Sequence, residues 1–155
     1  LDGRGVGNIV ISTDDYHRGA MWLRGQNDGR DWTEWDHPLV YDTAAMAEDI
    51  ARLIRREPVR ERRIDFTTAE PVLGNTLDTQ PVIIIEGIYA AAPEFAKFGG
   101  LRFDIETSLA TCMGRRLLRD RNERPQFADL EKSLLYMLEQ AEPMWRKQSQ
   151  GGAQA

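Results

Sequence analysis

PVIIIEG, at residues 81–87, is the stretch that decides the fold of this 155-residue chain. Residues 81–85 are apolar throughout, so both faces of the strand that they predict would be buried, as in a parallel sheet covered by helices. NIVIS, at residues 8–12, is a second short run of the same kind. Helical and extended patterns alternate along the chain. We therefore predict an α/β fold with a three-layer α/β/α parallel sheet, forming a single domain over residues 1–147.

Periodicity and helix-end signals predict the remaining elements. A helix over residues 44–57 has Asp42 available as its cap, and Pro58 ends it. Residues 59–66 and 71–79 are typical of two extended arms of a small exposed β-excursion. The other predicted elements are a short helix at 91–98, a third strand (LRFDI) at 101–105, helices at 108–121 and 127–147, and a disordered tail at 148–155.

Acidic side chains directly follow both apolar strands. Asp14 and Asp15 come after residues 8–12, and Glu86 follows residues 81–85, with Gly87 allowing a sharp turn near a ligand. Ligand sites of parallel α/β sheets lie at the carboxyl ends of the strands. There, a carboxylate could accept a proton from a substrate hydroxyl or hold Mg²⁺ through water. Each of these acids could equally be a turn, cap or strand-end residue without a chemical role.

Arginines concentrate in and just after the helix predicted over residues 108–121. The cluster consists of Arg115, Arg116, Arg119, Arg121 and Arg124. Arg116 and Arg119 are three residues apart and would share a helix face. Arginines on a helix can clamp the negative charge that phosphoryl transfer gathers on oxygen. The alternative is a solvated basic face balanced by nearby acids.

Aromatic and polar residues gather in the segment that precedes the helix at 44–57. They are Trp32, Trp35, Asp36, His37 and Tyr41. Such a set suits a base or a sugar, because rings can stack on one side while polar groups bind hydroxyls on the other. The same residues could instead pack the loop onto the domain, with His37 as a structural hydrogen-bonding histidine.

Composition excludes several classes of function. Hydrophobic residues make up 41% and charged residues 29%, which is typical of a soluble globular domain. The formal net charge of −5 gives no electrostatic reason to expect nucleic acid or an acidic membrane as a partner. The apolar run at residues 82–85 is far too short to cross a bilayer, and no other run approaches the necessary length. A single cysteine excludes an internal disulfide and favours a cytoplasmic location.

Four stretches resemble, in order, the uridine kinase and phosphoribulokinase-related family of P-loop kinases. They are ISTDDYHR (11–18), DWTEWDHPLVYD (31–42), VIIIEGIYA (82–90) and GRRLLRDRNER (114–124). They look like the family's strand with an aspartate and an aromatic, its aromatic-Asp-His-Pro signature, its strand ending in Glu-Gly, and its arginine-rich lid helix. The resemblance extends from about residue 8 to residue 145. It implies the P-loop nucleoside-triphosphate hydrolase-like kinase fold.

The resemblance also implies an activity and the residues that carry it. The chain would transfer a phosphoryl group from ATP, with Mg²⁺, to a hydroxyl of a small acceptor, nearest to a nucleoside. Asp14 would be the general base, and Glu86 with Asp14 would position the metal. Arg116, Arg119 and Arg124 would act near the phosphate. The residues implied to bind the acceptor are Tyr16, His17, Trp35, Asp36, His37 and Phe66. Members of this family often assemble, so a homo-oligomer is also expected.

Two departures from the family pattern bear on these expectations. Uridine kinases read the pyrimidine with a tyrosine and a histidine where this chain has Ile64 and Ala69. Another small metabolite could therefore be the acceptor, or the fold could bind a nucleotide or metabolite without catalysis. The family's G-x-x-x-x-G-K-[ST] loop, which cradles phosphates, is not in the sequence, because GRGVG at 3–7 has no lysine and leads into a strand. We expect that the residues of the N-terminal strand and the P-loop precede Leu1 and are missing from this sequence. The alternative is a degenerate protein that has no P-loop.

Overall fold

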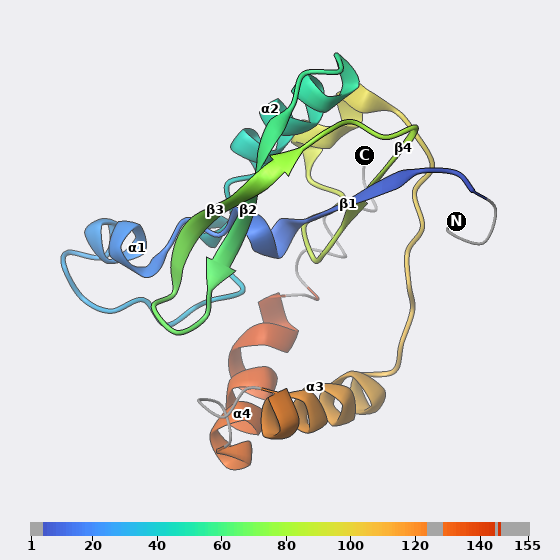
Figure 1. Ribbon diagram of the computed structural model, residues 1–155. Coiled ribbons are helices and arrows are strands. Elements are labelled where there is room, and N and C mark those ends of the chain that lie inside the picture. Colours follow the sequence, from blue (N-terminus) through green and yellow to red (C-terminus); the bar gives the residue numbers. More distant parts are fainter. Residues whose placement is uncertain (1–4, 124–128, 145, 147–155) are drawn as a thin grey trace. The chain divides into compact units, whose positions relative to one another are not determined.

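The computed structural model describes residues 5–123, 129–144 and 146, and the chain divides into two compact units, Leu1–Gly100 and Leu101–Ala155. The first unit contains the predicted pair of parallel strands. β1 (Asn8–Ser12) and β4 (Val82–Glu86) pair in unbroken register, with Asn8 opposite Val82 and Ser12 opposite Glu86 (Figure 1). These two predicted strands and the mixed α/β class are confirmed.

A second, antiparallel sheet of two strands follows in the same unit. β2 (Val59–Asp65) and β3 (Glu70–Leu77) form a hairpin whose register shifts between Arg60 and Arg62. Many of its side chains are exposed or half-buried, because the sheet has only these two strands. The two predicted extended arms are therefore confirmed as one hairpin.

The longest helix of the first unit is α2 (Thr43–Ile54), and its sequence explains both of its ends. The Asp42 carboxylate accepts a hydrogen bond from the Ala45 N–H at 3.1 Å and caps the first turn. The helix ends before the predicted Glu57, because Arg56 adopts a positive φ of 63° and turns the chain ahead of Pro58. Shorter helical elements are η2 (Thr13–Tyr16), α1 (Ala20–Gln26), η3 (Pro38–Val40) and η4 (Pro93–Phe98).

The core of the first unit lies where α2 meets the two sheets. The main cluster comprises Ile11, Tyr16, Met46, Ala47, Ile50, Leu53, Val59 and Phe95, and a second comprises Leu23, Val40, Tyr41 and Tyr89. Met46, Ile50 and Leu53 recur at helical spacing along α2, so one helix face supplies much of the first cluster. Burying each such side chain contributes about 1.5–3 kcal/mol. The core thus holds the ends of β1 and η2 against α2.

The second unit is helical. It contains α3 (Leu109–Glu123) and α4 (Leu130–Tyr136), and α4 continues through the π-turn η6 (Met137–Ala141). None of the helices in the described part of the chain is both long enough and apolar enough to cross a bilayer.

The strand predicted at residues 101–105 is wrong. These residues have no regular structure, and Leu101, Phe103 and Ile105 are 88%, 81% and 90% exposed. The alternation of apolar and polar residues in LRFDI is a strand pattern, but a strand is stabilised by the hydrogen bonds of a neighbour. In the part of the chain that the structure describes, no strand pairs with this segment.

Candidate functional site

Two acidic residues lie at the same edge of the parallel strand pair. Glu86 is the last residue of β4 and lies opposite Ser12, the last residue of β1. Asp14 follows two residues later in η2, where its backbone N–H donates to Ser12 Oγ at 3.3 Å. Both acidic side chains are exposed. The register therefore places Asp14 and Glu86 at the carboxyl edge where parallel sheets bind ligands.

The segments that leave β1 and β4 lie close together at Thr13 and Gly87. Gly87 has a φ of 118°, and a Cβ at this position would overlap Thr13 Oγ1. Only glycine fits both the backbone conformation and the close approach. Thr13 is completely buried, and its Oγ1 has no hydrogen-bond partner among the described residues. A buried hydroxyl with no partner among the described residues thus lies between the two strand exits, one residue before Asp14.

Negative charge accumulates at this edge. Burial raises the pKa of Asp15, and the neighbouring carboxylates of Asp14, Glu61 and Glu86 raise it further, while Arg63 lowers it. Such a group of acids favours a bound cation or a captured proton. Among the described residues no group of three or more His, Cys, Asp or Glu side chains is arranged to hold a metal ion. Mg²⁺ usually takes only one or two protein carboxylates, with water and phosphate oxygens completing its shell.

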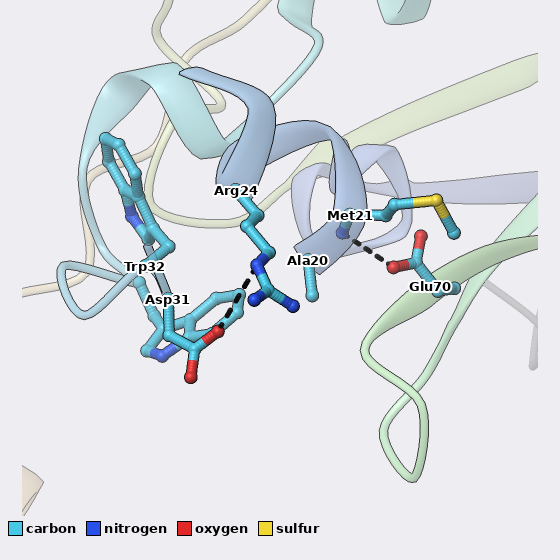
Figure 2. Close-up of a pocket in the computed structure, with 7 residues that line it drawn as sticks. Ala20, Met21, Arg24, Asp31, Trp32 and Glu70 are labelled. Atoms are coloured by element: carbon cyan, nitrogen blue, oxygen red, sulfur yellow. Dashed lines mark hydrogen bonds and ion pairs between the residues drawn. The ribbon is translucent and has the colours of Figure 1, made fainter. Parts of the chain in front are cut away.

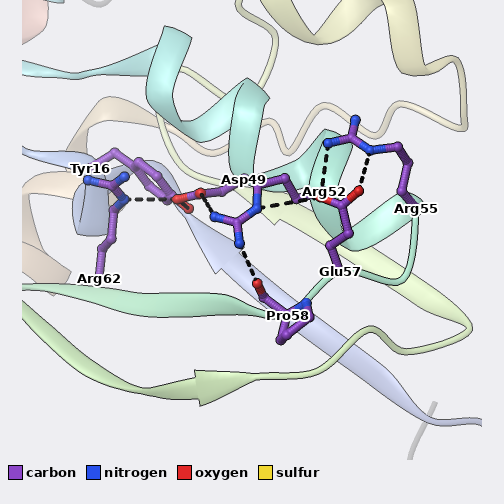
Figure 3. Close-up of polar contacts among 7 residues, drawn as sticks. All are labelled: Tyr16, Asp49, Arg52, Arg55, Glu57, Pro58 and Arg62. Carbon is purple, nitrogen blue, oxygen red and sulfur yellow. Dashed lines mark hydrogen bonds and ion pairs between the residues drawn. The ribbon is translucent and has the colours of Figure 1, made fainter.

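The two aromatic residues after Asp14 face different surroundings. Tyr16 is buried, and its hydroxyl donates to Asp49 Oδ2 at 3.1 Å (Figure 3). Burial, followed by the charge of Asp49, raises the pKa of Tyr16. This residue points into the core, although the resemblance implied that it contacts the acceptor.

His17 is half-buried and lies against Trp35. The two rings stack with centroids 5.4 Å apart and an interplanar angle of 23°. His17 Nδ1 accepts the Gly19 N–H at 3.0 Å, so in the neutral ring Nε2 carries the proton. Burial lowers the pKa of His17, and Glu70 opposes part of that change. His17 is therefore a neutral ring that stacks on Trp35 and can donate a hydrogen bond from Nε2.

An open pocket of about 400 Å³ lies beside these rings. It is lined by Ala20, Met21, Arg24, Asp31, Trp32, Trp35 and Glu70 (Figure 2). The rings of Trp32 and Trp35 supply apolar walls, and the carboxylates of Asp31 and Glu70 supply hydrogen-bond acceptors. The pocket thus combines flat surfaces from two tryptophans of the aromatic loop with polar groups that the sequence analysis did not single out.

The polar groups of the pocket are already partly engaged. Arg24 Nε donates to the Gly29 carbonyl at 2.6 Å and lies 3.9 Å from Asp31 Oδ1. Glu70 Oε1 accepts the Met21 N–H at 2.7 Å. Sequence analysis missed Met21, Arg24, Asp31 and Glu70, because their meeting depends on how the hairpin tip contacts α1. The only local feature that could have drawn attention to Glu70 is its position directly after the hairpin turn.

The other predicted acceptor-binding residues take different positions. His37 Nδ1 accepts the Leu39 N–H at 3.1 Å, and the ring makes an edge contact with Trp32, which orders the loop. The Asp36 carbonyl accepts the Tyr89 hydroxyl at 2.7 Å. Phe66 is 49% exposed on the hairpin turn. None of these three is among the residues that line the described pocket.

The predicted arginines belong to the second unit, and they differ from one another. Arg116 Nε lies 3.7 Å from Asp120 Oδ2, and its guanidinium carbon lies 5.5 Å from the centre of the Tyr136 ring. Asp120 is 2% exposed and accepts the Ser133 hydroxyl at 3.3 Å, so Arg116 helps to join α3 to α4. Arg119 is exposed on α3. Arg124 lies outside the described residues.

Comparisons with known proteins connect this site to one family. The chain is 32% identical over 120 residues to the uridine kinase of Ureaplasma parvum serovar 3, which covers 76% of this chain and 56% of that protein. It is 31% identical over 120 residues to the uridine kinase of Geobacillus sp. strain WCH70, with 75% and 55% covered. The chain is a homologue of the uridine kinases. No family profile matches it.

The fold of this uridine kinase homologue also has a counterpart among solved structures. A crystal structure described as a fructose transport system kinase from Silicibacter sp. TM1040 superimposes with a TM-score of 0.64 at 18% identity, covering 85% of this chain and 68% of that chain. This likeness concerns the fold. This chain spans 55–56% of the length of the two uridine kinases named above.

Within its first unit, the homologue brings some of the predicted residues together and separates others. Asp14 and Glu86 follow the same end of the paired strands, and His17 stacks on Trp35, which lines the pocket. Tyr16 faces the core instead. Two features of one unit therefore make up the candidate site: the acidic edge and the aromatic pocket.

Proposed function

We propose that this chain forms the acceptor side of an ATP-dependent phosphotransferase that acts on a hydroxyl of a small molecule, nearest to a nucleoside. One observation carries the proposal: a uridine kinase homologue has Asp14 and Glu86 at the same carboxyl edge of two paired parallel strands. The three-layer P-loop kinase fold, a single domain, a cytoplasmic location and a homo-oligomeric state belong to the same proposal.

In this proposal Asp14 is the general base. Its exposed carboxylate takes the proton of the acceptor hydroxyl while that oxygen forms a bond to the γ-phosphorus of ATP. The bond from that phosphorus to the bridging oxygen breaks, and ADP leaves. The charge of Asp14 is part of the acidic group that, after burial, raises the pKa of the neighbouring Asp15. Positioning and electrostatics supply most of the rate in phosphoryl transfer, so the fixed place of Asp14 after β1 matters as much as its basicity.

The residues present fit magnesium better than they fit the triphosphate. Carboxylate oxygens at one edge are the ligands that Mg²⁺ prefers, so Glu86 and Asp14 would hold it, directly or through water. The bound ion would neutralise charge on the transferred group. No loop of this chain is assigned to cradle the triphosphate, because the 155 residues contain no G-x-x-x-x-G-K-[ST] sequence. Arg116, Arg119 and Arg124 stay in the proposal as residues near the phosphate.

The aromatic pocket is the proposed acceptor site. Trp35 would present a flat face to a ring, and the neutral His17 could donate from Nε2 to an acceptor oxygen. Glu70 and Asp31 would accept hydrogen bonds from hydroxyl groups. Asp36, His37 and Phe66, and Tyr16 from its buried position, would shape the surrounding loop and hairpin.

A second candidate function is a kinase whose acceptor is not a pyrimidine nucleoside. Ile64 and Ala69 stand where the resemblance places a tyrosine and a histidine, and neither side chain can hydrogen-bond a base. Ala69 also has a φ of 55° at the hairpin tip, and its carbonyl accepts the Ala20 N–H at 2.8 Å. The hairpin tip therefore contacts α1. This arrangement favours an acceptor whose hydroxyl groups bind Glu70 and Asp31.

The test is an ADP-release assay on the protein expressed from its whole reading frame. Uridine and cytidine are compared with a panel of pantothenate-like and sugar-like acceptors, with and without Mg²⁺. Turnover of any hydroxyl acceptor supports the phosphotransferase, and the preferred acceptor decides between the two candidates. If no acceptor is turned over while nucleotide or metabolite binding persists, the non-catalytic reading replaces both.

A further inference from the structure

A buried polar cluster joins three elements of the first unit. Asp49 on α2 is 6% exposed and accepts hydrogen bonds from the Tyr16 hydroxyl at 3.1 Å and from Arg62 Nε at 2.9 Å (Figure 3). The Arg62 guanidinium carbon lies 5.1 Å from the centre of the Tyr16 ring. Loss of one partner of a buried charge leaves the others poorly compensated, so the cluster holds one arrangement. It ties η2, α2 and β2 together at one point.

The tip of the same hairpin makes a second attachment. The Ala69 carbonyl accepts the Ala20 N–H at 2.8 Å, and Glu70 Oε1 accepts the Met21 N–H at 2.7 Å (Figure 2). Both donors lie in the first turn of α1. The arm β2 therefore holds Tyr16 through Asp49, while the turn and start of β3 hold the beginning of α1.

The segment between these two attachments carries the proposed base. Residues 13–19 run from the end of β1 to α1, and Asp14 lies in them next to Asp15. Adjacent carboxylates repel each other, so nothing in their own charges keeps the turn in one conformation. The contact between Gly87 and Thr13 fixes the start of the segment. The hairpin contacts its middle through Asp49 and its end through α1, beside the backbone hydrogen bonds that join Tyr16 to Asp42 and Arg18 to Val40 at 2.8 Å.

We propose that the β2–β3 hairpin acts as a two-point clamp that positions Asp14, and that Asp49 is the positioning residue at the inner point. The proposal rests on the function proposed above, because it concerns the residue that takes the proton. Asp49 touches no substrate in this scheme. It orients the Asp14 turn through Tyr16 and couples it to the hairpin through Arg62, so the acceptor pocket beside Glu70 and the base keep a fixed spacing.

Kinetics on the whole protein test the coupling. Tyr16→Phe and Asp49→Asn are each expected to lower kcat roughly 10- to 100-fold with little change in the acceptor KM, since a misplacement of about 1 Å can cost about 100-fold. The double variant should be no slower than the slower single variant, because both act through one contact. Arg55→Gln is the matched control. Arg52 lies 3.9 Å from Asp49 and 3.7 Å from Glu57, and Glu57 pairs with the exposed Arg55 at 2.8 Å (Figure 3). Because Arg55 lies at the far end of these ion pairs and does not contact Tyr16, this variant should keep wild-type kinetics.

Hydrogen exchange on the same proteins separates the clamp from the proposed function. Amides of residues 13–19 should exchange faster in both variants, while those of β1, β4 and the buried turns of α2 stay protected. Faster local exchange in a protein without kinase activity would overturn the function and leave the clamp standing as a purely structural device. Wild-type exchange at 13–19 together with wild-type kcat in Tyr16→Phe, or a uniform loss of protection throughout the unit, would overturn the clamp. Tyr16→Phe removes one hydroxyl only and decides the question if Asp49→Asn fails to fold.

Discussion

The two units of the chain place their charged residues by different means. In Leu1–Gly100, Asp14 and Glu86 follow strands that pair in register over a buried core, so distant parts of the sequence determine where each carboxylate lies. In Leu101–Ala155, Arg116 contacts Asp120 on its own helix and Tyr136 on the next one. The comparison teaches that an acid after a buried strand is placed by the fold, whereas an arginine on an exposed helix is placed by its local contacts.

The largest expected effect tests whether the acids of the first unit do chemistry. Asp14→Asn should lower kcat roughly 100- to 10,000-fold, the range for losing a general base, with acceptor binding retained. The measurement is steady-state ADP release paired with calorimetric titration of the acceptor. Asp15→Asn is the control, since it removes the same charge from the same turn and should cost less than tenfold. Equal losses in the two variants would mean that net charge, and not a base at Asp14, controls the rate.

The next effect concerns the packing difference between the units. Leu53→Ala should lower the free energy of unfolding by about 2–5 kcal/mol, because Leu53 is completely buried against the main core. Leu118→Ala on α3 should change it by less than about 0.5 kcal/mol, since Leu118 is 60% exposed. Urea denaturation followed by circular dichroism measures both. A cost for Leu118→Ala close to that of Leu53→Ala would show that this face of α3 is covered in solution, and the contrast would fail.

How much the sequence could predict follows the same division. The apolar runs at 8–12 and 82–85 gave the strands and the place of Asp14 and Glu86, because each run had a partner of the same kind with which to pair. LRFDI has an equally good strand pattern, yet Leu101, Phe103 and Ile105 are exposed. Pattern alone does not supply the neighbouring strand on which a ladder depends.

Local spacing also did not reveal which polar side chains would make structural contacts within the protein. Arg116 and Arg119 share a helix face by periodicity, but Arg116 contacts Asp120 and Tyr136 while Arg119 is exposed. Tyr16 was expected at the acceptor, but Asp49, 33 residues away, binds its hydroxyl. These outcomes depend on tertiary contacts between elements that no short motif encodes.

A smaller effect tests the contact that holds the two strand exits together. Gly87→Ala should destabilise the first unit by about 1–3 kcal/mol more than Gly100→Ala, since overpacking against Thr13 costs about that much. The two glycines have similar φ values, 118° and 109°, but a Cβ at residue 100 would meet open space. The pair therefore separates steric overlap from backbone strain in one denaturation series. Equal costs would mean that Thr13 moves aside, and that Gly87 does not fix the acidic edge.

The smallest effect concerns the pH dependence that the first unit gains from burying a histidine. Burial lowers the pKa of His17 below its ordinary value, with Glu70 opposing part of that change, so the folded protein binds the imidazole proton more weakly than the unfolded chain does. Stability from this group is therefore fully present above the unfolded pKa of about 6.5 and falls as the pH drops toward the lower folded value. The control variant His17→Phe keeps a ring against Trp35 but has no imidazole to titrate. From pH 8 to pH 5, the melting temperature of the wild type should fall relative to that of His17→Phe. The carboxylates titrate in both proteins and cancel in that difference. A difference that instead grows in favour of the wild type at low pH would mean that Glu70 outweighs burial, and that His17 is charged beside the pocket rather than a neutral donor.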